Sequence, residues 1–172
     1  MTAEILVLRL VHILGGIFWV GIGLFNTFFL MPALGKVGPA AGPVIAALQQ
    51  RRLFTVLPTI AVLTILSGVR LLWIMSGGGN PAYFSSGVGR TFSMSGGAAI
   101  VAFLVGMFVA RPAALRAAAI ARTLATTEDP AAKGALSAQM ESARRRAAVT
   151  NTAAVALLVL SAAGMAVARY VG

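Results

Sequence analysis

Four long runs of apolar residues are the feature that most constrains how this chain can fold. They cover residues 5–30, 53–75, 92–110 and 147–168. A helix needs about 20 apolar residues to cross a hydrocarbon core roughly 30 Å thick, and each run is near or above that length. Lipid offers no hydrogen-bond partners to the backbone, so such runs are expected to be helical. The sequence therefore predicts an all-α integral membrane protein, a four-helix bundle in which residues 1–172 form one domain.

The composition agrees with a membrane protein and gives little support to catalysis. Charged residues make up 10% of the chain, whereas a soluble domain has about 25%. Cysteine is absent, which excludes disulfides and thiolate metal sites. The apolar runs contain no Asp or Glu that would serve as a general acid or base, and no nucleophile stands beside a base. Whether the protein is an enzyme is left open by these patterns.

The basic residues are distributed unevenly between the two sides of the predicted bundle. The segments that join runs one to two and three to four hold ten of the fourteen Lys and Arg residues. Because basic loops stay in the cytoplasm, both of these segments are expected there, and both termini are expected on the periplasmic side of a bacterial inner membrane. This orientation accounts for the net charge of +10 without a nucleic-acid partner. The same surface is expected to attract anionic membrane lipids.

The segment between the third and fourth runs predicts a cytoplasmic helical hairpin. Residues 113–127 are rich in alanine, and Glu128, Asp129 and Pro130 interrupt them. Asp129 is suited to cap the next helix and Pro130 to occupy its first position. The hairpin is either a solvated extension or a docking surface for another subunit. At the other cytoplasmic segment, we expect the first helix to end near Met31 and Pro32.

The first apolar run carries polar side chains at regular spacing. His12, Trp19 and Asn26 are seven residues apart and so lie near one stripe of a helix, which is expected to face the bundle interior. Arg9 lies one turn beyond His12, and Arg70 enters from the second run. Ionisable residues inside a membrane span mark functional sites by default. The alternatives are that the arginines reach the interface, that His12 donates to a backbone carbonyl, and that Trp19 fills the core.

A lone histidine limits the cofactors that the bundle can hold. His12 is the only histidine of the chain, so a zinc site with three or four protein ligands is excluded. One imidazole suffices as an axial ligand of haem iron, and Arg9 and Arg70 are suited to its two propionates. Copper is the alternative, because Met75, Met94 and Met165 lie in the outer half and thioethers bind Cu(I).

The first run resembles small four-helix bacterial membrane proteins related to CopD and to HemJ-type protoporphyrinogen oxidases. The resemblance lies in "HILGGIFWVG" (His12–Gly21), "MPAL" (Met31–Leu34) and "SGVRLLW" (Ser67–Trp73). It implies a haem b ligated by the first-helix histidine, or movement of copper across the inner membrane, with His12 as the ligand in either case. This chain departs from the HemJ pattern in having no second histidine.

These observations give two main functional hypotheses. The first is an inner-membrane protein that holds haem b or, as the less favoured alternative, copper, and that acts as an electron-transfer component. In this hypothesis His12 ligates the metal and Trp19 lines the site. Arg9 and Arg70 bind the haem propionates. The second is a structural accessory subunit without a cofactor, packed in a homodimer or a larger membrane complex. A small transporter or channel is weaker, because no buried charge pairs mark a path.

Overall fold

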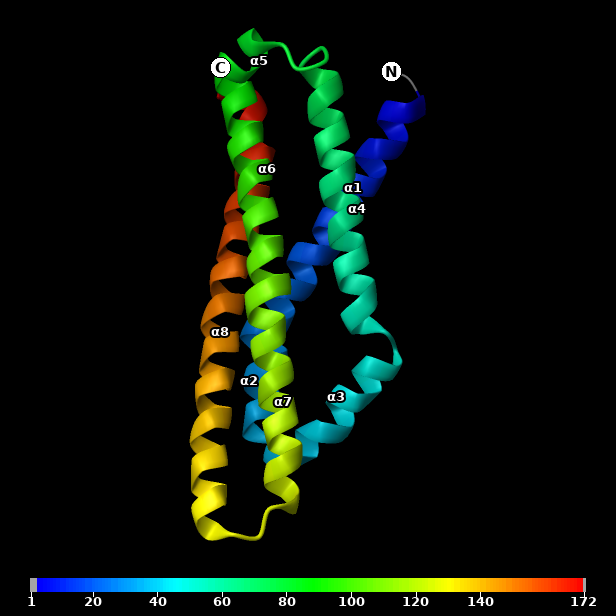
Figure 1. Ribbon diagram of the computed structural model, residues 1–172. Coiled ribbons are helices and arrows are strands. Elements are labelled where there is room, and N and C mark those ends of the chain that lie inside the picture. The colour runs from blue at the N-terminus through cyan, green and yellow to red at the C-terminus, as the bar shows by residue number, and fades with distance from the viewer. Residues whose placement is uncertain (1–2, 172) are drawn as a thin grey trace. The chain divides into compact units, whose positions relative to one another are not determined.

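The computed structural model describes residues 3–171, and within that range the chain is helical without a strand. Figure 1 shows the helices in chain order. Among these residues, four helical stretches are long and apolar enough to cross a membrane: Ala3–Lys36, Leu53–Met75, Gly87–Thr126 and Pro130–Tyr170. The predicted all-α class with four candidate spans is confirmed, as expected of a multi-pass membrane protein.

Shorter helical segments join and interrupt these stretches. The elements in chain order are α1 (Ala3–Phe25), the π-helical η1 (Asn26–Leu30), α2 (Met31–Lys36), the 3₁₀ turn η2 (Gly38–Ala40), α3 (Ala41–Gln50), α4 (Leu53–Met75), α5 (Pro81–Ser85), α6 (Gly87–Val105), the π-helical η3 (Gly106–Ala110), α7 (Arg111–Thr126), α8 (Pro130–Val167) and the 3₁₀ turn η4 (Ala168–Tyr170).

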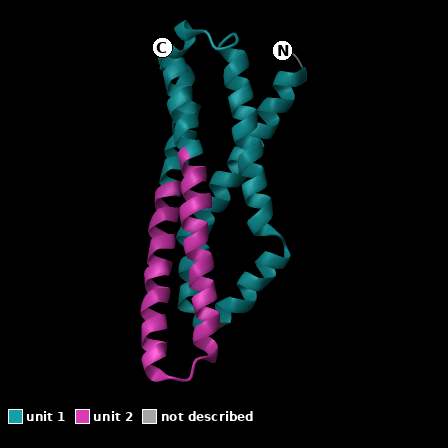
Figure 2. Cartoon of the chain, viewed as in Figure 1, with its two compact units in different colours: residues 1–100, 155–172 teal, residues 101–154 magenta. Residues whose placement is uncertain are grey.

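The chain forms two compact units, coloured separately in Figure 2. Unit 1 comprises residues 1–100 and 155–172, and unit 2 comprises residues 101–154. Unit 1 contains α1 to α5, most of α6 and the last part of α8, and its N-terminal end, α5 and C-terminal end lie at the same end of the unit (Figure 1). Unit 2 is a hairpin in which the end of α6, η3 and α7 lie against the first part of α8. The prediction of one domain over residues 1–172 remains a prediction.

The expectation that the first helix ends near Met31 and Pro32 is wrong. The helix continues through η1 and α2 to Lys36. Proline lacks an N–H, and its ring clashes with the carbonyl four residues earlier in a regular α-helix. The π-helical turn that precedes Pro32 widens the helix at that point, and the N–H of Met31 bonds to the carbonyl of Asn26. The helix therefore passes the proline instead of stopping at it.

The same arrangement recurs eighty residues later. The π-helical η3 precedes Arg111 and Pro112, and the N–H of Arg111 bonds to the carbonyl of Gly106. Each π-helical segment is five residues long. The local sequences also match, with Phe at the third position of each segment and a basic residue four positions after each proline. Two of the four long helices thus accommodate a proline in the same way, by a π-helical segment that precedes it.

Two backbone breaks separate the remaining helices. Arg52 adopts φ 57°, a left-handed conformation that ends α3 and turns the chain into α4. After α4, Gly77, Gly78 and Gly79 all have positive φ, which glycine tolerates without steric cost. The Asn80 side chain then accepts a hydrogen bond from the Ala82 N–H at 3.0 Å and caps the short helix α5.

The predicted hairpin between the third and fourth runs is present in unit 2. Helix α7 ends at Thr126, and α8 begins at Pro130. The Asp129 carboxylate accepts hydrogen bonds from the N–H groups of Ala131 at 3.1 Å and Ala132 at 3.2 Å. Both the cap and the position of Pro130 are therefore confirmed. Helix α8 then runs without a break for 38 residues.

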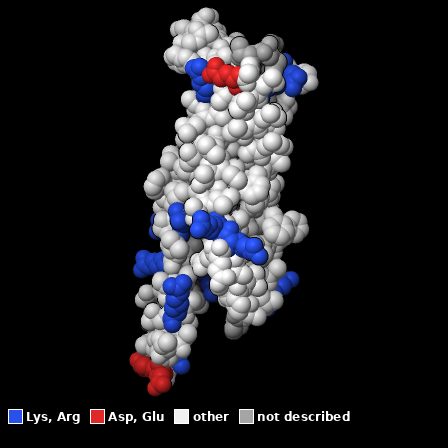
Figure 3. Space-filling view, turned by 90° about the vertical axis from the view of Figure 1, so that its right-hand side faces the viewer, with Lys and Arg blue, Asp and Glu red and all other residues white. Residues whose placement is uncertain are grey.

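Large apolar side chains cover much of the surface, as lipid contact requires. Helix α1 has one buried residue, Trp19, while Leu14 and Ile17 of α1 and Phe29 of η1 are each more than 60% exposed. In water such a surface would be a strong liability. On the face drawn in Figure 3 the charged side chains gather in groups, with uncharged surface between them.

Candidate functional site

Helices α1 and α4 of unit 1 pack closely where small residues face each other. Figure 1 shows α1 crossing α4 at this level. A Cβ at Gly15 would overlap the Thr64 hydroxyl, and one at Gly16 would touch the Thr64 methyl at 3.9 Å. Ala61, Thr64 and Ser67 are the buried residues of α4. Small side chains allow two helix backbones to approach in lipid, which fixes the two helices at the level of the histidine.

His12 lies at this crossing and is tied to α4. Its Nδ1 atom is 2.8 Å from the carbonyl oxygen of Thr64. A carbonyl only accepts, so Nδ1 carries the proton and donates. In a neutral imidazole the other nitrogen, Nε2, then keeps an available lone pair. The bond to a backbone carbonyl thus sets both the tautomer and the orientation of the ring.

Gly68 provides the space that the imidazole occupies. A Cβ at this position would lie 2.6 Å from Cε1 of His12, 2.9 Å from Nδ1 and 3.5 Å from Nε2. Any side chain at residue 68 would therefore displace the ring, and the absence of one is a requirement of the site. Of these three ring atoms, Nε2 is the farthest from that position.

The predicted stripe on the first helix faces inward in part. Trp19 is buried, at 8% exposure, and Gly23 faces Val155 of α8, whose Cγ2 would lie 3.3 Å from a Cβ at that position. His12 and Asn26 are half-buried. Asn26 begins the π-helical segment η1. Trp19 is therefore a core residue of unit 1 two turns from His12, which agrees with the packing interpretation of this residue.

Arg70 forms an ion pair that the sequence patterns did not predict. Its Nη2 and Nε atoms lie 2.7 Å and 2.9 Å from Oε1 of Glu4. The two side chains are 49% and 51% exposed, so the pair lies at the surface of unit 1. Glu4 is on α1, two turns before His12, and the pair is a second link between α1 and α4. The guanidinium predicted to meet a propionate already binds a carboxylate.

The other three arginines outside the two basic segments, Arg9, Arg90 and Arg169, differ in their surroundings. Arg9 is exposed, and among residues 3–171 it forms no ion pair. Arg90 donates from Nη2 to the carbonyl of Ser85 at 2.6 Å and so ties α6 to α5. The Arg169 guanidinium lies 5.7 Å from the centre of the Tyr170 ring. Arg9 lies one turn before His12 on the same helix, and its side chain is exposed.

The methionines considered for copper do not form a buried set. Met94 is 75% exposed and Met75 is 50% exposed. Among residues 3–171, no group of three or more His, Asp or Glu side chains is placed to hold a metal ion. A haem needs a single protein ligand, whereas Cu(I) needs several soft ligands around it.

Three residues of the site escaped the sequence patterns: Thr64 and Gly68, which receive the imidazole, and Glu4, which holds Arg70. The spacing of Thr64 and Gly68 by four, in a helix otherwise rich in bulky residues, is the signal of a close helix contact. No family model, no curated protein and no solved structure matches the chain.

Proposed function

We propose that the protein holds a haem b through His12, in the outer half of the bundle, as an electron-transfer component. The observation that supports this most is the bond from Nδ1 of His12 to the Thr64 carbonyl at 2.8 Å. Metal-ligating histidines generally donate their second ring N–H to a carbonyl or carboxylate, which orients the ring and raises the basicity of the ligand atom. His12 has this arrangement already in place.

The basic residues at this end fit the propionate groups of a haem. Arg70 takes the Glu4 carboxylate through two nitrogens, which is the same chemistry that a propionate would offer. Both side chains are half-exposed, so an exchange of one carboxylate for another is inexpensive. Arg9 is available for the second propionate. Haem b supplies one-electron redox chemistry when it is bound, and the protein supplies the axial nitrogen and the counter-charges.

The charge distribution supports a periplasmic location for this site. The loops rich in Lys and Arg are expected in the cytoplasm, which puts His12, Arg9 and Arg70 near the periplasmic face of a bacterial inner membrane. A redox cofactor at that depth would exchange electrons with a periplasmic protein or with another subunit. The CopD-like and HemJ-like resemblance of residues 12–21 is consistent with this assignment.

The experiment that tests the proposal is chemical rescue. The His12→Ala variant is expressed with haem supplied and purified in detergent, and its visible spectrum is recorded before and after addition of imidazole. We expect a Soret band in the unaltered protein, a weakened band in the variant and recovery with imidazole. A protein that stays colourless under haem supply, while folded by circular dichroism, would refute the proposal.

A structural accessory subunit is the second candidate, and a specific observation favours it. The His12–Thr64 bond, the Gly68 contact and the Glu4–Arg70 pair all link α1 to α4, so each has a purely structural use. Under this hypothesis His12→Ala lowers the melting temperature without changing any spectrum. Co-purification of a stoichiometric membrane partner with the colourless protein would then support the subunit function.

A further inference from the structure

A groove in unit 2 lies between the two helices of the hairpin and is lined in part by positively charged side chains. Its volume is about 520 Å³. Helix α7 and the preceding η3 contribute Phe108, Val109 and Arg116 to its lining, and α8 contributes Gln139, Ser142 and Arg146. None of the lining residues is acidic. Guanidiniums from two different helices therefore share one cavity with an amide and a hydroxyl.

The two ends of this groove differ in polarity. Phe108 is 69% exposed and belongs to the last, π-helical turn of the third apolar run. Arg116 and Gln139 lie farther along the hairpin, beyond the apolar runs. The groove thus passes from an apolar end, at the level where both long helices leave the apolar sequence, to a polar and cationic end. Phospholipids have the same polarity at the same depth, with acyl chains on one side and a phosphate on the other.

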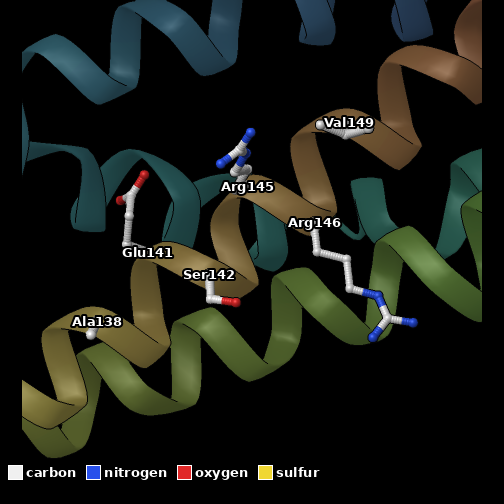
Figure 4. Close-up of a pocket in the computed structure, with 6 residues that line it drawn as sticks. All are labelled: Ala138, Glu141, Ser142, Arg145, Arg146 and Val149. Atoms are coloured by element: carbon white, nitrogen blue, oxygen red, sulfur yellow. The ribbon is translucent and has the colours of Figure 1, made fainter.

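Arg146 and its neighbour Arg145 extend from different sides of α8. Figure 4 shows Glu141 and Arg145 extending from one side of α8, whereas Arg146 extends from the opposite side, where α7 runs. Arg145 thus has an acid four residues earlier on its own side, which lowers the local positive charge. Arg146 has no acidic neighbour in the groove that it shares with Arg116.

We infer that this groove binds the headgroup of an anionic phospholipid from the cytoplasmic leaflet. Arg116 and Arg146 meet the phosphate through charge-assisted hydrogen bonds, Gln139 and Ser142 bind its remaining oxygens or the glycerol, and Phe108 with Val109 contacts the acyl chains. Unit 2 holds seven basic and three acidic side chains, so its field also favours an anion. This inference does not depend on the haem proposal.

The test compares two double variants that lose equal charge. Arg116→Gln with Arg146→Gln removes both guanidiniums of the groove. Arg111→Gln with Arg122→Gln is the matched control, because neither residue lines the groove and Arg111 donates to the Met107 sulfur at 3.3 Å. Each protein is titrated with phosphatidylglycerol or phosphatidylcholine in detergent, and retained lipid is counted by native mass spectrometry. Circular dichroism verifies that the variants are folded.

We expect the unaltered protein to retain phosphatidylglycerol in preference to phosphatidylcholine. The groove variant should bind it at least tenfold more weakly, and the control should change less than about threefold. Equal losses in the two double variants would show a general attraction to the basic surface and overturn the inference. Equal retention of both lipids would also overturn it. Displacement of the lipid by millimolar inorganic phosphate would show that a free anion, not a lipid, is the ligand.

Discussion

The imidazole of His12 and the carbonyl of Thr64 form the polar contact at the α1–α4 crossing, with 2.8 Å between Nδ1 and the oxygen. The carbonyl of Thr64 lies within helix α4 and takes part in the backbone hydrogen bonding of that helix. The imidazole therefore donates to an acceptor that α4 already uses. The contact therefore needs the two backbones to be close, which the small residues at positions 15, 16 and 68 make possible. Ring orientation and helix packing are coupled here.

This coupling predicts the effect of a methyl group at residue 68. In Gly68→Ala the new Cβ would lie 2.6 Å from Cε1 of His12, so the ring must move and lose its bond to Thr64. We expect a loss of about 1–3 kcal/mol in the free energy of unfolding, measured in detergent. Gly21→Ala is the control, because a Cβ there meets nothing within 4 Å. Equal melting temperatures for the two variants would contradict the proposed packing.

The contact between α6 and α8 in unit 1 makes a similar prediction. A Cβ at Gly164 would overlap the Ser95 hydroxyl, and Ser161 donates to the Ser95 carbonyl at 2.7 Å. Gly164→Ala should therefore destabilise the protein, and Ser95→Ala should relieve part of that loss. A double-mutant cycle of thermal unfolding should give a favourable coupling of about 0.5–3 kcal/mol. Simple additivity of the two changes would show that the side chains do not meet.

Tyr83 of α5 carries a buried hydroxyl with no hydrogen-bond partner among residues 3–171. An unsatisfied buried polar atom costs about 1–3 kcal/mol, so Tyr83→Phe should stabilise the protein by up to this amount. Burial also raises the pKa of this phenol above its usual 10.0. The corresponding stability is present below pH 10 and is lost as the pH rises through the raised pKa. Unfolding curves of Tyr83→Phe, recorded at neutral and alkaline pH, should not show this loss of stability.

The helix cap at Asp129 predicts a local effect in unit 2. Asp129→Ala removes the acceptors of the Ala131 and Ala132 N–H groups. Loss of such a cap costs about 0.5–2 kcal/mol, and the first turn of α8 should exchange its amide hydrogens faster. Hydrogen exchange read by mass spectrometry gives the result directly. Glu128→Ala should leave the rate unchanged, and faster exchange in that variant as well would argue against a specific cap.

Much of the architecture was predictable because lipid imposes strong rules on sequence. The lengths of the four runs, their helical state and the hairpin with its cap at Asp129 all follow from local patterns. The passage of the helix through Pro32 was not predictable, because it depends on a π-helical turn at Asn26–Leu30 that has no composition signal of its own. The recurrence of Phe–x₃–Pro at residues 28–32 and 108–112 would have indicated it.

The candidate site was only half predictable for a similar reason. The polar residues His12, Arg9 and Arg70 are conspicuous in an apolar context, so the sequence singles them out. Their partners Thr64 and Glu4 depend on how α1 crosses α4, which is a tertiary property. The carboxylate of Glu4, in the first turn of α1, is the partner of Arg70, in the place considered for a propionate.

The central claim is most directly tested by the haem-to-chain ratio of His12→Asn. The side-chain amide of asparagine takes the position of Nδ1 and can donate to the Thr64 carbonyl, but it lacks a nitrogen suited to ligate iron. This variant therefore removes the iron ligand and keeps the packing contact. After expression with haem supplied, we predict about one haem per chain or per pair of chains in the unaltered protein. We predict near-background haem in the variant, at a similar melting temperature. Equal haem content in the two proteins, or none in either, would contradict His12 as the axial ligand.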